Sequence, residues 1–119
     1  MAEPTARFEI YADRLGEWRF RYCCSESQPR LRASEGYSAK VNALKAVESL
    51  RRNAPIDARY DFKVNSRGRH FFTLRARNGN ILAVSRNHVD EDDLHADVAK
   101  IRAEIEDAQV VEREATAEV

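Results

Sequence analysis

The stretch FEIYADRLGEWRFRY, Phe8–Tyr22, places aromatic and basic residues on alternate positions. Trp18, Phe20 and Tyr22 share one parity, and the arginines between them share the other. Successive side chains of a β-strand point to opposite faces, so this pattern predicts a strand with one apolar and one solvated face. Burying such an aromatic ring is worth about 2–3 kcal/mol, which a small domain needs for its core. We therefore interpret the aromatic parity as the interior face.

The same pattern recurs in the second half of the chain. Without a gap, GEWRFRY at 16–22 lies over GRHFFTL at 68–74. Phe8 and Ile10 then match Phe62 and Val64, if the second turn is two residues shorter. Recurrence of one unit predicts a tandem repeat. We expect a single domain over residues 1–119, made of a first repeat at 7–54, a second repeat at 60–108 and a frayed acidic C-terminal tail at 109–119.

Each repeat reads as three short strands followed by a helix. Asn78-Gly79 predicts a tight type I′ hairpin in the second repeat. Ser38 and Asp90 are suitable N-cap residues, and the first helix is expected to end near Asn53-Ala54-Pro55. The second helix is expected to continue to about Ala108.

The predicted helices and strands supply one shared core. Apolar residues recur at helical spacing, Ala43, Val47, Leu50 and Ala54 in the first helix and Leu94, Val98, Ile101 and Ile105 in the second. The inward strand positions are Phe8, Ile10, Trp18, Phe20, Tyr22, Leu31 and Ala33, with Phe62, Val64, His70, Phe72, Leu74 and Ile81 or Leu82 as counterparts. We expect Trp18 to be buried against Val47 and Leu50.

Several motifs resemble those of the YegP-like family, a family of short tandem repeats catalogued as a domain of unknown function. They are GEWRFR at 16–21, SEGYSAK at 34–40 and VESLRRNA at 47–54. Lys45-Ala46 departs from the Asn-Gly that the family often has in this helix, and His88 stands where the first repeat has Tyr37. The resemblance implies an α+β fold of two tandem β-β-β-α repeats related by a pseudo-twofold axis, with antiparallel sheets packed against two helices. It implies no known reaction.

The net charge of zero conceals an uneven distribution. Residues 1–87 hold 17 Lys and Arg against 9 Asp and Glu, whereas residues 88–119 hold 3 against 11. The two segments therefore carry +8 and −8. A basic body with an acidic extension is one interpretation, and an arginine-rich sheet beside an acidic helix is the other.

Composition also restricts the compartment. No apolar run is long enough to span a bilayer, and the first residues lack the apolar stretch of a signal peptide. Cys23 and Cys24 are adjacent and make no disulfide framework. We expect a cytoplasmic protein without a membrane partner.

Few residues suggest catalysis or metal binding. His88, Asp92 and His95 have the spacing of a helical metal set, since two imidazoles and a carboxylate bind zinc or iron. We interpret them instead as exposed polar residues, and we expect no metal and no cofactor. Neither a Gly-x-Ser-x-Gly elbow nor a phosphate-binding glycine loop occurs, so no catalytic residue is predicted and a non-enzymatic role is favoured.

A binding role remains, through the solvated sheet face. The candidate residues on that face are Arg19, Arg21, Arg30, Arg32, Phe71, Arg75 and Arg77. Edge strands and an exposed Phe71 favour a protein partner, either unidentified or a second copy. Arginines on a sheet can also follow phosphates, so weak nucleic-acid binding is the alternative. A pI near 6.8 argues against a dedicated nucleic-acid protein.

Overall fold

The computed structural model describes residues 6–23 and 29–113, which form two helices and seven strands. The first half consists of β1 (Arg7–Ala12), β2 (Trp18–Cys23), β3 (Pro29–Ala33) and α1 (Lys40–Asn53). A short 3₁₀ turn, η1 (Asp57–Arg59), leads to β4 (Tyr60–Val64), β5 (His70–Arg75), β6 (Ile81–Ser85) and α2 (Glu91–Glu104). A second 3₁₀ turn, η2 (Ile105–Asp107), is followed by β7 (Gln109–Glu112). Within the described residues, neither helix is long and apolar enough to cross a membrane.

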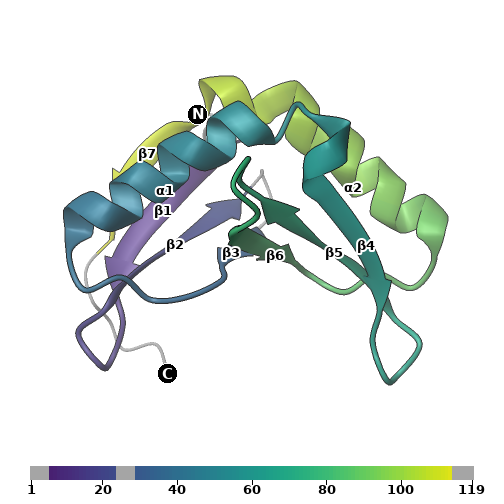
Figure 1. Cartoon of the computed structure of the whole chain (residues 1–119), viewed down its shortest axis with the longest axis horizontal. Helices are drawn as coiled ribbons and strands as arrows, with labels where there is room; N and C mark the ends of the chain where they lie inside the picture. Colours follow the sequence, from purple (N-terminus) through teal and green to yellow (C-terminus); the bar gives the residue numbers. More distant parts are fainter. Residues whose placement is uncertain (1–5, 24–28, 114–119) are drawn as a thin grey trace, which may run out of the picture.

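All seven strands belong to one sheet, in the order β4-β5-β6-β3-β2-β1-β7. The α+β class is therefore confirmed, but the two sets of strands join where β3 pairs with β6 instead of forming separate sheets. Neighbouring strands are antiparallel except β1 and β7, which are parallel. Both helices cross the same face, α1 above β1 and β2 and α2 above β4 and β5 (Figure 1).

The core lies between this sheet face and the helices. Phe8, Phe20, Tyr22, Leu31, Phe72 and Leu74 are fully buried beneath Val47, Leu50 and Ile101. Trp18, Phe62 and Val64 were predicted to lie in the core and differ from this pattern, since Trp18 is half-buried and the two residues of β4 are exposed. Trp18 is only half-buried, because it lies near the start of α1 with the Lys40 ammonium 5.4 Å from its ring centroid. Cys23 is buried, whereas Cys24 lies outside the described residues.

The first hairpin of each half has the same length, which corrects the expectation of a shorter second turn. Five residues separate β1 from β2 and β4 from β5. Asp13 Oδ1 accepts the backbone N–H of Leu15 and Glu17, and Asn65 Oδ1 accepts the equivalent N–H groups two and four residues further on. Matching side-chain acceptors fix matching turns. Ile10 therefore corresponds to Phe62, and Ala12 corresponds to Val64.

Asn78-Gly79 forms the predicted hairpin but not the predicted turn type. A type I′ turn needs positive φ at both central residues. Gly79 has φ 94°, whereas no residue other than glycine has positive φ in the described ranges. Gly79 N–H donates to Ala76 O and Ala76 N–H donates to Asn80 O, which is a three-residue loop with glycine at the left-handed position.

The two helices begin differently. The predicted cap of α2 is confirmed, since Asp90 Oδ1 accepts the N–H of Asp93 at 2.9 Å. The cap of α1 is Ala39 and not Ser38, and it makes no side-chain capping bond. The first helix ends at Asn53, as expected.

The predicted frayed tail is wrong for the residues that the structure describes. The helix ends at Glu104, η2 turns the chain, and Gln109–Glu112 form β7 beside β1. Phe8 lies opposite Val110, and β-branched valines favour a strand conformation. Residues 114–119 lie outside the described residues.

Candidate functional site

The predicted arginine face carries its own carboxylates. Arg19 Nε lies 2.8 Å from Asp13 Oδ2, and Arg75 Nε lies 2.9 Å from Asp61 Oδ2. The hydrogen bond from Arg19 lowers the pKa of Asp13, so this carboxylate stays ionised beside its partner. These guanidinium groups are already neutralised by neighbours on the same face.

Glu9 on β1 accepts hydrogen bonds from three further arginines. Arg21 Nε donates to Oε1 at 2.8 Å, while Arg7 and Arg113 donate to Oε2 at 2.7 and 3.0 Å. Burial alone would raise the pKa of Glu9, but the hydrogen bonds from the three arginines outweigh it and lower the pKa to about 2. Arg21, predicted as a binding residue, is thus part of an internal charge cluster.

Arg30 does not lie on the solvated face where it was predicted. A β-bulge shifts the register, so that Tyr22 lies opposite Leu31 while Cys23 lies opposite Pro29. The extra residue is Arg30, and bulges redirect side chains. Its guanidinium is buried in an ion pair with Asp97 on α2. Arg30 is therefore unable to contact an external ligand in this structure.

The other predicted residues are accessible but scattered. Arg32 is exposed near the centre of the sheet, and Arg77 is exposed in the hairpin between β5 and β6. Phe71 on β5 is half-buried. The seven predicted residues therefore do not form one continuous site.

A buried charge cluster surrounds Asp97. His88 Nε2 lies 2.7 Å from Asp97 Oδ2, and Arg86 Nε lies 3.1 Å from the same oxygen. Burial lowers the pKa of His88, as do the positive charges of Arg86 and Arg30. A neutral ring then donates from Nε2 to the carboxylate. Because Asp97 is shared among these donors, it is not available as a general base, and the cluster fixes α2 on the sheet.

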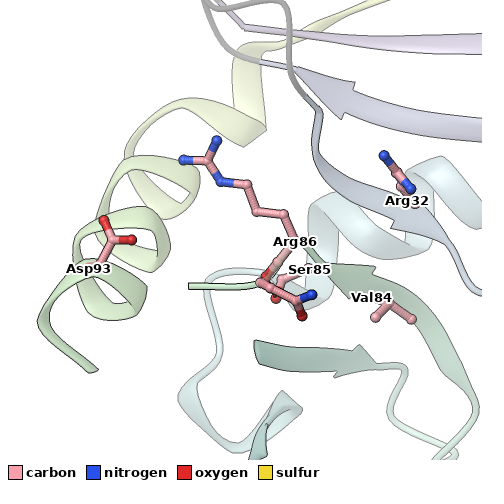
Figure 2. Close-up of a pocket in the computed structure, with 6 residues that line it drawn as sticks. Arg32, Val84, Ser85, Arg86 and Asp93 are labelled. Atoms are coloured by element: carbon pink, nitrogen blue, oxygen red, sulfur yellow. Dashed lines mark hydrogen bonds between the residues drawn. The ribbon is translucent and has the colours of Figure 1, made fainter. Parts of the chain in front are cut away.

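A cavity of about 600 Å³ opens beside this cluster. It is lined by Arg32, Val84, Ser85, Arg86, Asn87 and Asp93. Figure 2 shows Arg86 extending toward α2, with Asp93 on the facing helix and Arg32 on the strand across the cavity. The lining is mixed in charge and contains neither a nucleophile–base pair nor converging carboxylates, so it does not describe a catalytic centre.

The histidines also lie apart. His88 is buried against Asp97, whereas His95 is exposed and its ring centroid lies 5.3 Å from that of Phe62. His88 is thus not the exposed polar residue that was expected. No group of three His, Cys, Asp or Glu side chains able to hold a metal occurs within residues 6–23 and 29–113.

The outer edge of β4 is open. His70 exchanges both backbone hydrogen bonds with His88, at 2.9 and 2.7 Å, on the side away from β4. Val64, which faces His70, therefore points its own N–H and C=O outward, and antiparallel alternation extends this to Phe62. No other described segment pairs with this edge. Free donors and acceptors on a strand edge are a template for another strand.

Apolar side chains accompany these free backbone groups. Phe62 is 52% exposed and Val64 is 59% exposed, although both were predicted to be buried. Ile10, which corresponds to Phe62, is only 1% exposed. The difference follows from β7, which lies beside β1 and has no counterpart beside β4 among the described residues. A depression of about 300 Å³ adjoins the open edge, lined by Phe62, Lys63, Val64, His70, Glu91, Leu94 and His95.

One signal for the buried cluster was present in the sequence. Asp97 stands three residues after Leu94 and four before Ile101, within the apolar stripe of the second helix. A carboxylate in a buried stripe requires a buried partner. The sequence held no such signal for the open edge of β4, because that edge is open only since β7 pairs with β1.

Comparison with known proteins agrees with the two halves seen in the fold. The model of the family described as "Domain of unknown function (DUF1508)" matches residues 13–61 and again residues 65–112. The chain belongs to this family. Each DUF1508 match starts in the turn after the first strand of a repeat and continues into the strand that follows the helix. The matched units are therefore shifted by about one strand from the repeats at 7–54 and 60–108.

Several DUF1508 relatives are similar over most of the chain or over one unit. A UPF0339 protein in the ptx operon 5' region of Stutzerimonas stutzeri is 39% identical over 88% of this chain and 94% of its own length. UPF0339 protein Atu0232 of Agrobacterium fabrum is 48% identical over 40% of this chain and 76% of its own length, so it has room for little more than one unit. The solution NMR structure of E. coli yegP, a protein of unknown function, superposes with a TM-score of 0.86 at 24% identity, covering 98% of this chain and 100% of yegP.

Proposed function

We propose that this chain is a non-catalytic cytoplasmic interaction module that binds a protein partner through the edge of β4. The observation that carries the proposal is the contrast between Phe62, which is 52% exposed, and its counterpart Ile10, which is 1% exposed. An exposed aromatic residue beside an open strand edge is uncommon in a monomer, because both features promote association with another chain. A partner strand would satisfy the backbone groups and cover the aromatic ring at once.

The opposite edge of the sheet supports this mode of binding. There, β7 lies parallel to β1, and the N–H of Arg113 donates to Ile10 O at 2.8 Å. An extended segment added to the outermost strand of a hairpin thus completes one half of this sheet. The equivalent position in the other half is vacant among the described residues.

We infer that the halves are related by a pseudo-twofold axis passing between Arg32 and Val84. These residues lie opposite each other in the β3–β6 pair, and they hold the same position in their repeats when Gly16 is matched with Gly68. Such an axis makes β4 the counterpart of β1. On this basis the open edge is a place where the two halves differ, since β7 covers β1 and no described strand covers β4.

The nucleic-acid alternative receives less support from the geometry. Phosphate binding needs arginines whose charge is free. Arg19, Arg21 and Arg75 are each within 3 Å of a carboxylate oxygen, and Arg30 is buried. The protein partner is therefore the preferred proposal.

Affinity capture with matched surface variants tests the proposal. Phe62→Asp places a charge beside the open edge, and Val41→Asp is the control, because Val41 is 55% exposed but lies on α1. From an extract of the source organism, wild type and Val41→Asp should retain the same partner, and Phe62→Asp should lose it. Capture of identical proteins by all three chains would overturn the proposal.

A further inference from the structure

Resting on the proposed function, the geometry points to a second copy of this chain as the occupant of the β4 edge. The two β4 strands pair antiparallel, with Phe62 opposite Phe62 of the second copy. The sheets of the two copies then become continuous across a twofold axis. Such an axis gives a closed dimer and leaves no β4 edge for further growth.

The backbone of β4 restricts the possible registers. Tyr60, Phe62 and Val64 have carbonyl groups on the outer side, whereas Asp61 and Lys63 bond inward to β5. The N–H of Tyr60 is occupied by Asp57 O, which leaves the N–H groups of Phe62 and Val64 as the free donors. Antiparallel pairing requires outward-facing residues to lie opposite each other. The axis must therefore pass through Asp61, Phe62 or Lys63, if most of the strand is to pair.

Charge selects one of these three registers. An axis through Asp61 sets two Asp61 carboxylates opposite each other, and an axis through Lys63 does the same with two ammonium groups. Like charges directly opposite are destabilising. An axis through Phe62 instead sets Asp61 opposite Lys63 of the second copy, twice by symmetry. Lys63 has no ion pair within the described part of its own chain, so its charge is available.

On the opposite face of the sheet, the same register places apolar side chains opposite each other. Phe62 lies opposite Phe62 of the second copy, and Tyr60 lies opposite Val64 of the second copy. Within one chain Phe62 already stacks on Tyr60, with ring centroids 6.1 Å apart and 11° between the planes. Aromatic and β-branched cross-strand pairs are stabilising. One register thus satisfies the free backbone groups, the charges and the exposed aromatic ring.

The other sheet edge is a weaker candidate for self-association. Strand β7 has four residues and carries Glu112, whose carboxylate is 2.6 Å from Lys40 Nζ. Short and charged edge strands resist pairing. Because a five-residue strand contributes a small interface, the dimer formed by β4 should be weak and concentration-dependent.

A complementary pair of charge variants tests this interface. Asp61→Lys gives a strand with two lysines, and Lys63→Asp gives a strand with two aspartates. Each variant alone sets like charges opposite each other, so its dimer dissociation constant should rise at least about tenfold over wild type. Mixed in equal amounts, the two variants restore both ion pairs and should form a heterodimer. Sedimentation velocity up to millimolar protein concentration measures all four samples.

Amide hydrogen exchange on the wild-type chain locates the contact without any substitution. The N–H groups of Phe62 and Val64 should exchange more slowly as protein concentration rises. Those of Asp61 and Lys63, which already bond to β5, should change little. Protection elsewhere, without protection at Phe62, would overturn the assignment.

Two results separate this inference from the proposed function. A wild-type chain that stays monomeric throughout the concentration series overturns the dimer. If the wild-type chain is monomeric but Phe62→Asp still loses a heterologous partner in the capture experiment, the proposed function stands and only the dimer is ruled out. Dimerisation of both charge variants as strong as that of wild type also overturns the β4 interface.

Discussion

The guanidinium of Arg113 donates from Nη2 to Oε2 of Glu9 across 3.0 Å, which fixes the end of β7 to β1. The backbone supports the same contact, since the N–H of Arg113 donates to Ile10 O. Ile10 is buried at this edge. The segment after α2 is therefore part of the folded sheet.

Truncation after Ala108 should lower the free energy of unfolding by about 2–4 kcal/mol, because it removes the β1–β7 hydrogen bonds and the cover over Ile10. Urea unfolding followed by circular dichroism measures the change. Truncation after Arg113 is the control, since it retains β7 and should leave the midpoint unchanged. Equal midpoints for the two truncated chains would show that β7 contributes nothing to stability.

Glu9→Gln should destabilise the protein by about 2–3 kcal/mol near neutral pH. The pKa of Glu9 falls from its ordinary value of 4.5 to about 2 in the folded state, so the unfolded state binds more protons between these values. Stability from Glu9 is thus present above about pH 4.5 and is lost as the pH falls toward 2. Urea midpoints of the wild type and Glu9→Gln should converge across this window. A constant difference down to pH 2 would contradict this role of Glu9.

Local patterns predicted much of the fold. Alternation at Trp18–Cys23 identified a strand, Asn78-Gly79 identified a hairpin, and Asp90 identified the start of α2. These features depend on neighbours in sequence. The turn at Asn78-Gly79 was assigned the wrong type, because an additional residue, Arg77, belongs to the loop.

The features that the sequence did not predict depend on pairing between segments that are distant in the chain. Val110 and Val111 read equally well as an overshooting helix, and only β1 makes them a strand. Phe62 has the parity of a core residue, but its burial depends on a strand beside β4 that the described chain does not supply. Arg30 does not lie on the predicted binding face for a similar reason, since a bulge turned its side chain toward Asp97.

Asp97→Ala should be strongly destabilising, by about 3–5 kcal/mol, because it leaves the buried guanidinium of Arg30 without its carboxylate. Asp61→Ala is the matched control. Its carboxylate also binds an arginine, Arg75, but both side chains are more than one third exposed, so the loss should be within about 1 kcal/mol. Chemical denaturation of the two variants at neutral pH gives the comparison. Similar losses would mean that the Asp97 cluster is no more important than a surface ion pair.

Phe20→Ala should cost more stability than Trp18→Ala, although both residues have the same parity on β2. Phe20 is fully buried and its ring lies edge-on to Phe8 at a centroid distance of 6.4 Å, so its truncation should cost about 3–5 kcal/mol. Trp18 is half-buried under Lys40, and its truncation should cost about 1–2 kcal/mol. Because Trp18 is the single tryptophan of the chain, its fluorescence emission reports this partial exposure directly. Lys40→Met should alter that emission while lowering stability by no more than about 1 kcal/mol. An equal cost for the two aromatic truncations, measured by urea unfolding, would place Trp18 in the core after all.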